Sequence, residues 1–295
     1  NSKLELNAGG RAFEGTDGYL TLGGLAGVGL DPNYEQGFAF LDLRGHQLIE
    51  GDQAYNAALG YRWADWSDGS VWGVNAGLSG RSRDGDWYTW CNFGVERLSP
   101  DFDLRANGYL LCGDGEHDLR CEAQGFQGNS LLVANRADLG MEGFDVSLGA
   151  GSTALIPGTE LYGKLEFYWF TAAYDDDALG GRAELEWQVH DSVALSGWVS
   201  HDTLFETSGL VGIRVSLGGP AERADRLRDD FGTGERLVSF IERRDLMAIN
   251  EDALDGGSEG PLVDGNGDAI PFWHVDNTAA PGGDGTYERP FDTLA

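Results

Sequence analysis

Side chains of alternating character run through most of this chain, from about Lys3 to Gly218. In the clearest stretch, LYGKLEFYW (161–169), the odd positions are apolar or small and the even positions are mostly polar or charged. Successive side chains of a β-strand point to opposite faces, so such a segment has one apolar and one polar face. A soluble β-sandwich would alternate too. Runs of about ten residues, repeated many times between turn signals, are typical of a transmembrane β-barrel instead.

The alternation predicts an all-β fold in which about twelve antiparallel strands form a transmembrane barrel over residues 1–219. In such a barrel the apolar face meets lipid and the polar face lines a pore. The predicted strands span residues 3–13, 18–28, 36–48, 53–64, 69–82, 86–98, 102–112, 143–154, 161–174, 179–190, 193–203 and 208–218.

Loop lengths give an expected orientation. The connections after even-numbered strands, 99–101, 154–160 and 190–192, are short, whereas 81–86, 172–181 and 113–142 follow odd-numbered strands and are longer. Bacterial barrels have short periplasmic turns and longer extracellular loops. We therefore expect Asn1 in the periplasm and the long acidic loops outside the cell.

Composition supports a barrel and limits the partners. The chain has 46 glycines and 9 tryptophans in 295 residues, which suits curved strands and aromatic girdles. The girdle candidates are Tyr55, Tyr61, Trp63, Trp72, Trp87, Trp169 and Trp187. A formal net charge of −29 argues against nucleic acid as a partner. It suits an acidic pore, and an acidic solvated surface accounts for it as well.

The sequence offers no catalytic, cofactor or metal constellation, so we expect no enzyme activity. The five histidines are not at metal-ligand spacing. Asp264, Asn266 and Asp268 match the start of a calcium loop, but Ala269 stands where that loop needs glycine. A plain turn is the simpler interpretation. Cys112 and Cys121 form a candidate disulfide, which would leave Cys91 free on a strand.

The character of the chain changes after Pro220. Residues 221–245 carry six arginines against seven acids, and residues 221–230 are compatible with a short helix. On composition alone a solvated periplasmic linker is the simpler interpretation, and a segment that threads the pore and pairs with its acids is the alternative. Beyond it, residues 251–295 contain a predicted hairpin around the Asp-Gly-Asn-Gly turn at 264–267 and a turn-rich end.

Five motifs in order resemble the inverse autotransporter β-domain, the translocator barrel of the intimin and invasin family. They are FLDLRG (40–45), ALGYRW (58–63), GVNAGLSGRSRDG (73–85), FGVERLSPDFDLRANGYL (93–110) and GFDVSLGAG (143–151). The resemblance covers roughly residues 1–250. Residues 274–295 resemble the opening of a right-handed β-helix passenger. The chain departs from that family in its acidity and shows no peptidoglycan-binding module or immunoglobulin-like repeats.

The resemblance implies a twelve-stranded barrel in the bacterial outer membrane that exports a C-terminal passenger by type V secretion, with a role in adhesion. The chain would leave the last strand, run back through the pore and emerge outside. This favours the threading interpretation for residues 220–250. The implied partners are outer-membrane lipid, the passenger in cis, the barrel-assembly machinery and periplasmic chaperones.

Two sets of charged residues would then meet in the pore. The candidates on the barrel wall are Asp42, Arg44, Arg62, Glu96, Asp103, Arg105, Lys164, Glu166, Arg182, Glu184, Glu186 and Arg214. The candidates on the threading segment are Arg223, Arg226, Arg228, Arg236, Arg243 and Arg244. Two rival functions stay open: an acidic porin-like channel without passenger export, and a soluble secreted β protein.

Overall fold

The computed structural model describes residues 2–8, 18–29, 37–49, 51–151, 161–172, 177–190, 192–217, 236–237 and 239–293. The chain divides into two compact units. Unit 1 comprises residues 1–115 and 140–250, and unit 2 comprises residues 116–139 and 251–295. No helix in the described parts of the chain is long and apolar enough to cross a membrane.

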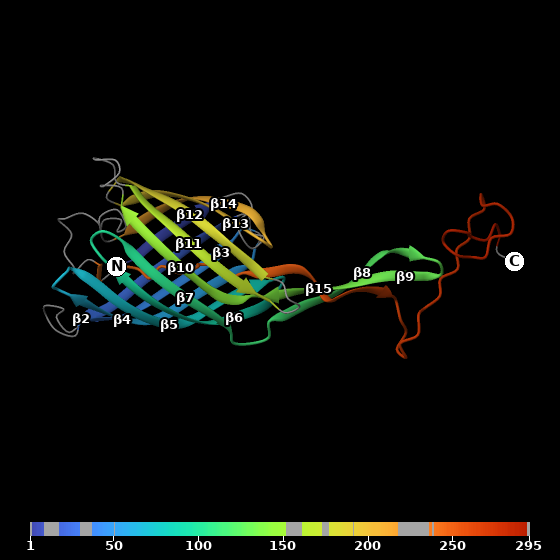
Figure 1. Cartoon of the computed structure of the whole chain (residues 1–295), viewed down its shortest axis with the longest axis horizontal. Helices are drawn as coiled ribbons and strands as arrows, with labels where there is room; N and C mark the ends of the chain where they lie inside the picture. The colour runs from blue at the N-terminus through green and yellow to red at the C-terminus, as the bar shows by residue number, and fades with distance from the viewer. Residues whose placement is uncertain are drawn as a thin grey trace. The chain divides into compact units, whose positions relative to one another are not determined.

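Unit 1 is an antiparallel β-barrel, which confirms the predicted all-β barrel (Figure 1). Among the described residues twelve strands form it, and β1 closes the ring by pairing with both β2 and β14. Each strand overlaps its predicted range, and the predicted strand ends at 9–13, 152–154 and 173–174 lie outside the described residues. The strands are β1 (Ser2–Ala8), β2 (Gly18–Gly29), β3 (Phe38–Leu48), β4 (Gln53–Asp65), β5 (Ser70–Arg83), β6 (Asp86–Leu98), β7 (Asp103–Leu111), β10 (Glu142–Gly151), β11 (Leu161–Thr171), β12 (Asp177–His190), β13 (Val193–Asp202) and β14 (Glu206–Leu217).

The faces of the barrel are inverted relative to those of a soluble protein. Along β3 the buried positions include Asp42, Arg44 and His46, whereas Leu41 and Leu43 between them are exposed. The same arrangement recurs on β10, where Asp145 and Ser147 are buried and their apolar neighbours are exposed. The period-two pattern of the sequence therefore separates a polar interior from an apolar outer surface.

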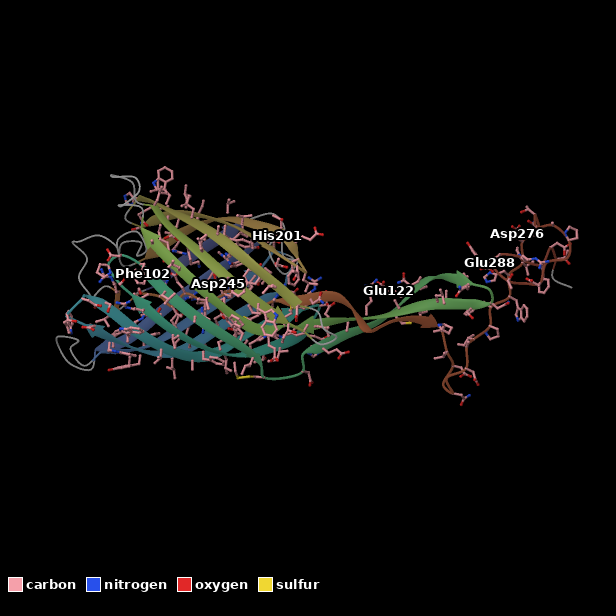
Figure 2. The ribbon with its side chains drawn as sticks, in the orientation of Figure 1. Phe102, Glu122, His201, Asp245, Asp276 and Glu288 are labelled. Carbon is pink, nitrogen blue, oxygen red and sulfur yellow. A yellow bond between two sulfur atoms is a disulfide. The ribbon has the colours of Figure 1, made fainter. Side chains whose placement is uncertain are left out.

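Because adjacent strands run in opposite directions, the turns alternate between two ends of the barrel. We call one the Gly69 end, which holds the turns at 66–69 and 99–102, and the other the Met141 end, which holds those at 49–52, 84–85 and 203–205. Figure 2 labels Phe102 at the first and His201 toward the second.

Aromatic side chains on the outer face lie near both ends. Tyr55, Trp87 and Trp169 are near the Met141 end, with the rings of Tyr55 and Trp87 5.8 Å apart. Near the Gly69 end lie Trp63, Trp66, Trp72 and Trp187, of which Trp63 and Trp72 are cross-strand neighbours. Tyr55 and Trp63 are eight residues apart on β4. At roughly 3.3 Å per residue and a tilt of about 40° this spacing is about 20 Å of barrel height.

Glycine lets aromatic rings lie flat across neighbouring strands. A Cβ atom on Gly60 would overlap the ring of Phe40, and one on Gly80 would overlap the ring of Tyr55. These are close approaches that only a residue without a side chain allows. Some of the many glycines are therefore explained by the space that neighbouring aromatic rings need.

Unit 2 contains strands that the sequence analysis missed. Residues 113–142 were expected as one loop, but they include β8 (Glu116–Gln127) and β9 (Ser130–Gly140), which pair as a hairpin. With β15 (Ile249–Pro261) they form a three-stranded sheet in the order β15-β9-β8. The predicted turn at 264–267 is confirmed by the antiparallel bridge between Val263 and Ala269.

One expected loop length is wrong. The stretch 81–86, expected as a long loop, is a tight hairpin of Asp84 and Gly85 with φ values of 51° and 99°, which suits a two-residue primed turn. The connection expected at 154–160 lies outside the described residues.

The predicted disulfide between Cys112 and Cys121 is also wrong. Cys91 and Cys112 are joined, with their Cα atoms 5.9 Å apart, and Cys121 on β8 is free and exposed. Cys91 lies on β6, and the Cys112 amide extends the β6–β7 ladder by donating to the Thr89 carbonyl at 2.9 Å. Pairing between neighbouring strands, rather than closeness in sequence, sets the bond.

Candidate functional site

The interior of the barrel holds a segment of the chain that follows the last barrel strand. We call the described residues 236–237 and 239–250 the inner segment. At the Gly69 end, Arg236 Nη1 donates to the Gly69 carbonyl at 2.6 Å. At the other end, the Met141 amide donates to the Ala248 carbonyl at 3.0 Å. The inner segment therefore runs through the barrel from one end to the other, and Figure 2 labels Asp245 within the barrel.

Arg62 on β4 holds the first part of the inner segment. Its guanidinium donates to the carbonyl oxygens of Leu237, Ser239 and Phe240. The same group donates from Nε to Glu96 Oε1 at 2.6 Å, and the side chain is fully buried. A buried segment that pairs with no neighbouring strand must satisfy most of its carbonyls with side chains. Arg62 does this for three residues at once.

Arg44 on β3 holds the middle of the inner segment. Its Nε and Nη2 atoms each lie 3.0 Å from an oxygen of Asp42, and its Nη1 lies 2.8 Å from Asp245 Oδ1. It also donates to the Ile241 carbonyl, while the Ile241 amide donates to Asp42 Oδ2 at 3.3 Å. Asn56 on β4 completes the contact by donating to the Asp245 carbonyl at 2.7 Å.

Arg244 on the inner segment contacts the opposite wall. Its Nη2 lies 2.6 Å from Glu166 Oε1 on β11, and its guanidinium lies over the ring of Tyr168 at 4.3 Å. The Arg244 amide donates to the Tyr109 hydroxyl at 3.1 Å, and that hydroxyl donates to Asp145 at 2.7 Å. The inner segment is thus tied to both sides of the barrel.

Apolar side chains of the inner segment pack against the barrel wall near both ends. Near the Gly69 end, Leu237, Phe240 and Ile241 pack in a cluster with wall residues that include Phe38 and Phe40. Near the Met141 end, Met247, Ala248 and Ile249 pack with Tyr88, Trp90, Tyr109, Met141, Tyr168, Phe170 and Ala178. The ion pairs of the inner segment lie between these two clusters.

The structure places all twelve wall candidates on the inner face. These are Asp42, Arg44, Arg62, Glu96, Asp103, Arg105, Lys164, Glu166, Arg182, Glu184, Glu186 and Arg214. Of the six predicted arginines of the threading segment, Arg236, Arg243 and Arg244 lie in the inner segment. Arg223, Arg226 and Arg228 lie outside the described residues, as does the expected helix at 221–230.

The described side chains of the interior carry both signs of charge, as the wall candidates predicted. The cations include Arg44, Arg62, Arg81, Arg105, Lys164, Arg182, Arg214, Arg236, Arg243 and Arg244. The carboxylates that face them include Asp42, Glu96, Asp103, Asp145, Glu166, Glu184, Glu186, Asp202, Glu242 and Asp245. Such mixing is favoured because buried charge is costly unless it is paired.

Several interior residues were not predicted. Arg81, whose Nη1 donates to the Met247 carbonyl at 3.0 Å, lies at the end of the predicted strand 69–82 and in the expected connection 81–86, and it was not among the candidates. Glu242 and Asp245 were counted only as acids of the linker, yet Glu242 Oε2 lies 3.5 Å from Arg105. The period-two pattern of the strand, continued to its end, places Arg81 inside. No local pattern could have matched Glu242 to Arg105, because the two are far apart in sequence.

A cavity of about 70 Å³ remains beside the inner segment. Its lining includes Lys164, Arg182, Glu184, Arg214 and Arg243. The three guanidinium nitrogens of Arg243 are buried and make no hydrogen bond to any described residue. Elsewhere in the described parts of the chain, no group of three His, Cys, Asp or Glu residues is arranged to hold a metal ion.

Comparisons with known proteins support the fold alone. No family model matches the chain, and no curated protein matches it. A solved structure described as "Unveiling the Mechanism Behind the in-meso Crystallization of Membrane Proteins" matches with a TM-score of 0.62 and 16% identity, over 84% of this chain and 98% of the other. The chain therefore shares a β-barrel fold with a structure from work on membrane proteins.

Proposed function

We propose that this chain is an outer-membrane translocator that anchors a C-terminal passenger and displays it at the cell surface, as an inverse autotransporter does. The observation that carries the proposal is the inner segment, which follows the last barrel strand and runs from the Gly69 end to the Met141 end. This is the path of a passenger that leaves through the barrel. Adhesion is the role that the family resemblance favours for such a passenger.

The outer surface supports a membrane location. Leu22, Leu59, Leu165 and Val211 are each more than 60% exposed on separate strands, whereas soluble monomers rarely expose large contiguous apolar patches. The aromatic residues near both ends match the girdles of outer-membrane barrels. Their separation of about 20 Å is close to the typical apolar height of about 25 Å.

The filled interior favours a translocator over a porin. Arg62 and Arg44 of the wall bind the inner segment, Arg244 of the inner segment binds Glu166 of the wall, and a cavity beside the segment is about 70 Å³. A porin of this strand number would need a continuous aqueous channel. The inner segment runs through that space, and apolar clusters pack against it near both ends.

The order of the chain at the Met141 end supports export. The Gly140 amide donates to the Gly115 carbonyl at 2.7 Å, and Met141 is bonded to Ala248. The chain leaves or enters unit 1 at three places, near residues 115, 140 and 250, and these places are close together in unit 1. The parallel bridge between Val275 and Phe291 is the type of pairing that a β-helix passenger uses.

The proposal predicts that unit 2 is at the cell surface. Cys121 is a native probe because it is free and exposed, whereas Cys91 and Cys112 are bonded to each other. We expect a membrane-impermeant maleimide to label Cys121 in intact cells. In a Cys121→Ser background, Thr278→Cys should be labelled as well, because Thr278 is exposed in the tail.

The matched control is Asp101→Cys in the Cys121→Ser background. Asp101 is exposed in a turn at the Gly69 end, so it should react only after the outer membrane is permeabilised. Labelling of Thr278→Cys only after permeabilisation would contradict export and favour the porin-like alternative. Two results would favour the soluble alternative. The protein would be purified without detergent, and its migration on a gel would not change with heating.

A further inference from the structure

The tip of the β8–β9 hairpin binds the tail that follows β15. Asn129 Nδ2 donates to the carbonyls of Phe272 at 2.8 Å and Gly285 at 3.1 Å. The Phe272 amide donates to the Asn129 carbonyl at 2.7 Å, and the Tyr287 amide donates to the Gly128 carbonyl at 2.9 Å. The Gly128 amide in turn donates to the carboxylate of Glu288 at 3.1 Å. Two turn residues therefore bind four positions spread along the tail.

Phe126, just before this tip, supplies the centre of an aromatic cluster. Its ring centroid lies 4.4 Å from that of His274, 5.6 Å from that of Phe272 and 5.7 Å from that of Tyr287. His274 and Tyr287 also meet each other at 5.4 Å. Three aromatic rings of the tail thus contact the same side chain, Phe126. Phe126 belongs to β8, which lies between the barrel strands β7 and β10 in the sequence.

The tail's own interactions are turns and a small number of longer-range contacts, among them the bond from the His274 amide to the Gly285 carbonyl at 3.0 Å and the stacked rings of Trp273 and Phe291, 6.0 Å apart. Asp264, Asp276 and Asp284 each accept hydrogen bonds from residues two positions ahead, as in Asx turns. Two isolated bridges, Val263–Ala269 and Val275–Phe291, are its internal strand pairings. Short hairpins and turns of this kind are marginally stable in water at best. The hairpin adds to these contacts the bonds of Gly128 and Asn129 and the ring of Phe126.

We propose that the β8–β9 hairpin is an intramolecular folding template for residues 262–293, the segment that begins the passenger. β15 enters the sheet beside β9, and the Leu262 amide continues the contact by donating to the Leu131 carbonyl at 2.7 Å. Phe272 then reaches Asn129, and Tyr287 reaches Gly128. Each part of the tail meets the hairpin in the order in which it would follow β15.

This inference rests on the proposed function for its role in export. The hairpin belongs to the barrel part of the sequence, so it precedes the tail along the chain and is anchored by β7 and β10. A tail that folds onto the hairpin after crossing the barrel would be held on the far side, because returning would break the contacts. Folding of the tail on the anchored hairpin thus opposes its return through the barrel and makes export one-directional.

The test is hydrogen exchange of the purified full chain in detergent, compared between native protein and two hairpin variants. Phe126→Ala removes the shared ring, and Asn129→Ala removes both side-chain bonds to the tail. We expect amides of residues 262–293 to exchange at least about tenfold faster in Phe126→Ala, because three ring contacts are lost at once. Barrel peptides should exchange at the native rate.

The matched control is Glu122→Ala, since Glu122 pairs with Arg136 within the hairpin at 2.9 Å. Glu122→Ala should leave the amides of the tail as protected from exchange as in the native protein. Phe126→Tyr should keep most of the protection that Phe126→Ala loses. Native protection of the tail in both hairpin variants would overturn the template. Equal loss of protection in the barrel would overturn it too, because the effect would then be global. Hydrogen exchange of the purified protein tests the template, and cysteine labelling in intact cells tests export. The failure of one proposal can therefore be told from the failure of the other.

Discussion

At the scale of single residues, one arginine does most to hold the inner segment near the Gly69 end. Arg62 joins Glu96 on the wall to three carbonyls of the inner segment. Its guanidinium also lies 4.8 Å from the ring of Phe40. A planar group with five donors can make such a set of contacts, and a lysine cannot. Arg62 therefore couples the wall to the threaded chain.

We predict that Arg62→Gln loosens the inner segment. Glu96 would lose its closest cationic partner, and removal of one member of a buried pair costs about 3–5 kcal/mol. Hydrogen exchange of the amides at 239–241 should report an opening free energy lowered by a few kcal/mol. The double variant Arg62→Gln/Glu96→Gln should recover part of the loss.

Arg97→Gln is the control, because Arg97 pairs with the half-exposed Asp68 at 3.1 Å. Exposed pairs contribute about 0–1 kcal/mol, so the inner segment should keep its protection in this variant. Equal exchange rates in Arg62→Gln and Arg97→Gln would mean that the apolar clusters, not Arg62, hold the inner segment.

At the scale of elements, the tail uses repeated Asp-x-Thr turns. Thr286 donates from its hydroxyl and its amide to Asp284, and Thr278 does the same to Asp276. These bonds favour the ionised carboxylate, so they hold the pKa of Asp284 and that of Asp276 below the usual value for aspartate. The turns are therefore formed by charged carboxylates.

We predict that Thr286→Val raises the pKa of Asp284 toward the ordinary value near 3.9, because the largest cause of its depression, the Thr286 hydroxyl, is removed. Carbonyl-carbon NMR of labelled aspartate would measure it, with Asp276 as the internal control. A pKa depressed in the folded state gives stability that is present above the unfolded value and is lost as pH falls through the folded value. The turns should thus persist down to about pH 4 and weaken below it. An unchanged Asp284 titration in Thr286→Val would contradict the assigned cause.

The elements also show how far the sequence was sufficient. Barrel strands were predictable because each has one apolar and one polar face, and the same parity placed all twelve wall candidates inside. β8 and β9 were missed because a hairpin outside the barrel has no continuous apolar face to reveal it. Cys91 was taken as free because strand pairing, not spacing, brings Cys112 beside it. The partners of the inner segment depend on contacts between distant parts of the chain, which no local pattern records.

At the scale of the whole molecule, charge is divided unevenly. The chain carries a net charge of −29, yet the described side chains of the barrel interior include many cations beside the carboxylates. Pairing of opposite charges inside the barrel is the arrangement that the cost of burial favours.

We predict that the native protein has low conductance in a planar bilayer and that deletion of residues 236–250 raises it severalfold. The inner segment fills the interior, and without it the lumen of a twelve-stranded barrel would be lined by the paired wall residues and water. The inner-segment variant Arg243→Gln is the control, because the guanidinium of Arg243 makes no hydrogen bond to any described residue. High conductance in the native protein would show that the barrel is open.

The sheet of unit 2 has a mechanical consequence. β15 lies beside β9, and both strands begin or end next to the bonded pair of Met141 and Ala248. A pulling force on the far end of β15 would load the backbone bonds between the two strands together, in shear, instead of peeling them one at a time. Tension would then divide between the threaded chain and the wall strand β10 that follows β9. Under the proposed function, a passenger would therefore be held to the barrel by two segments of the chain, the inner segment and β10.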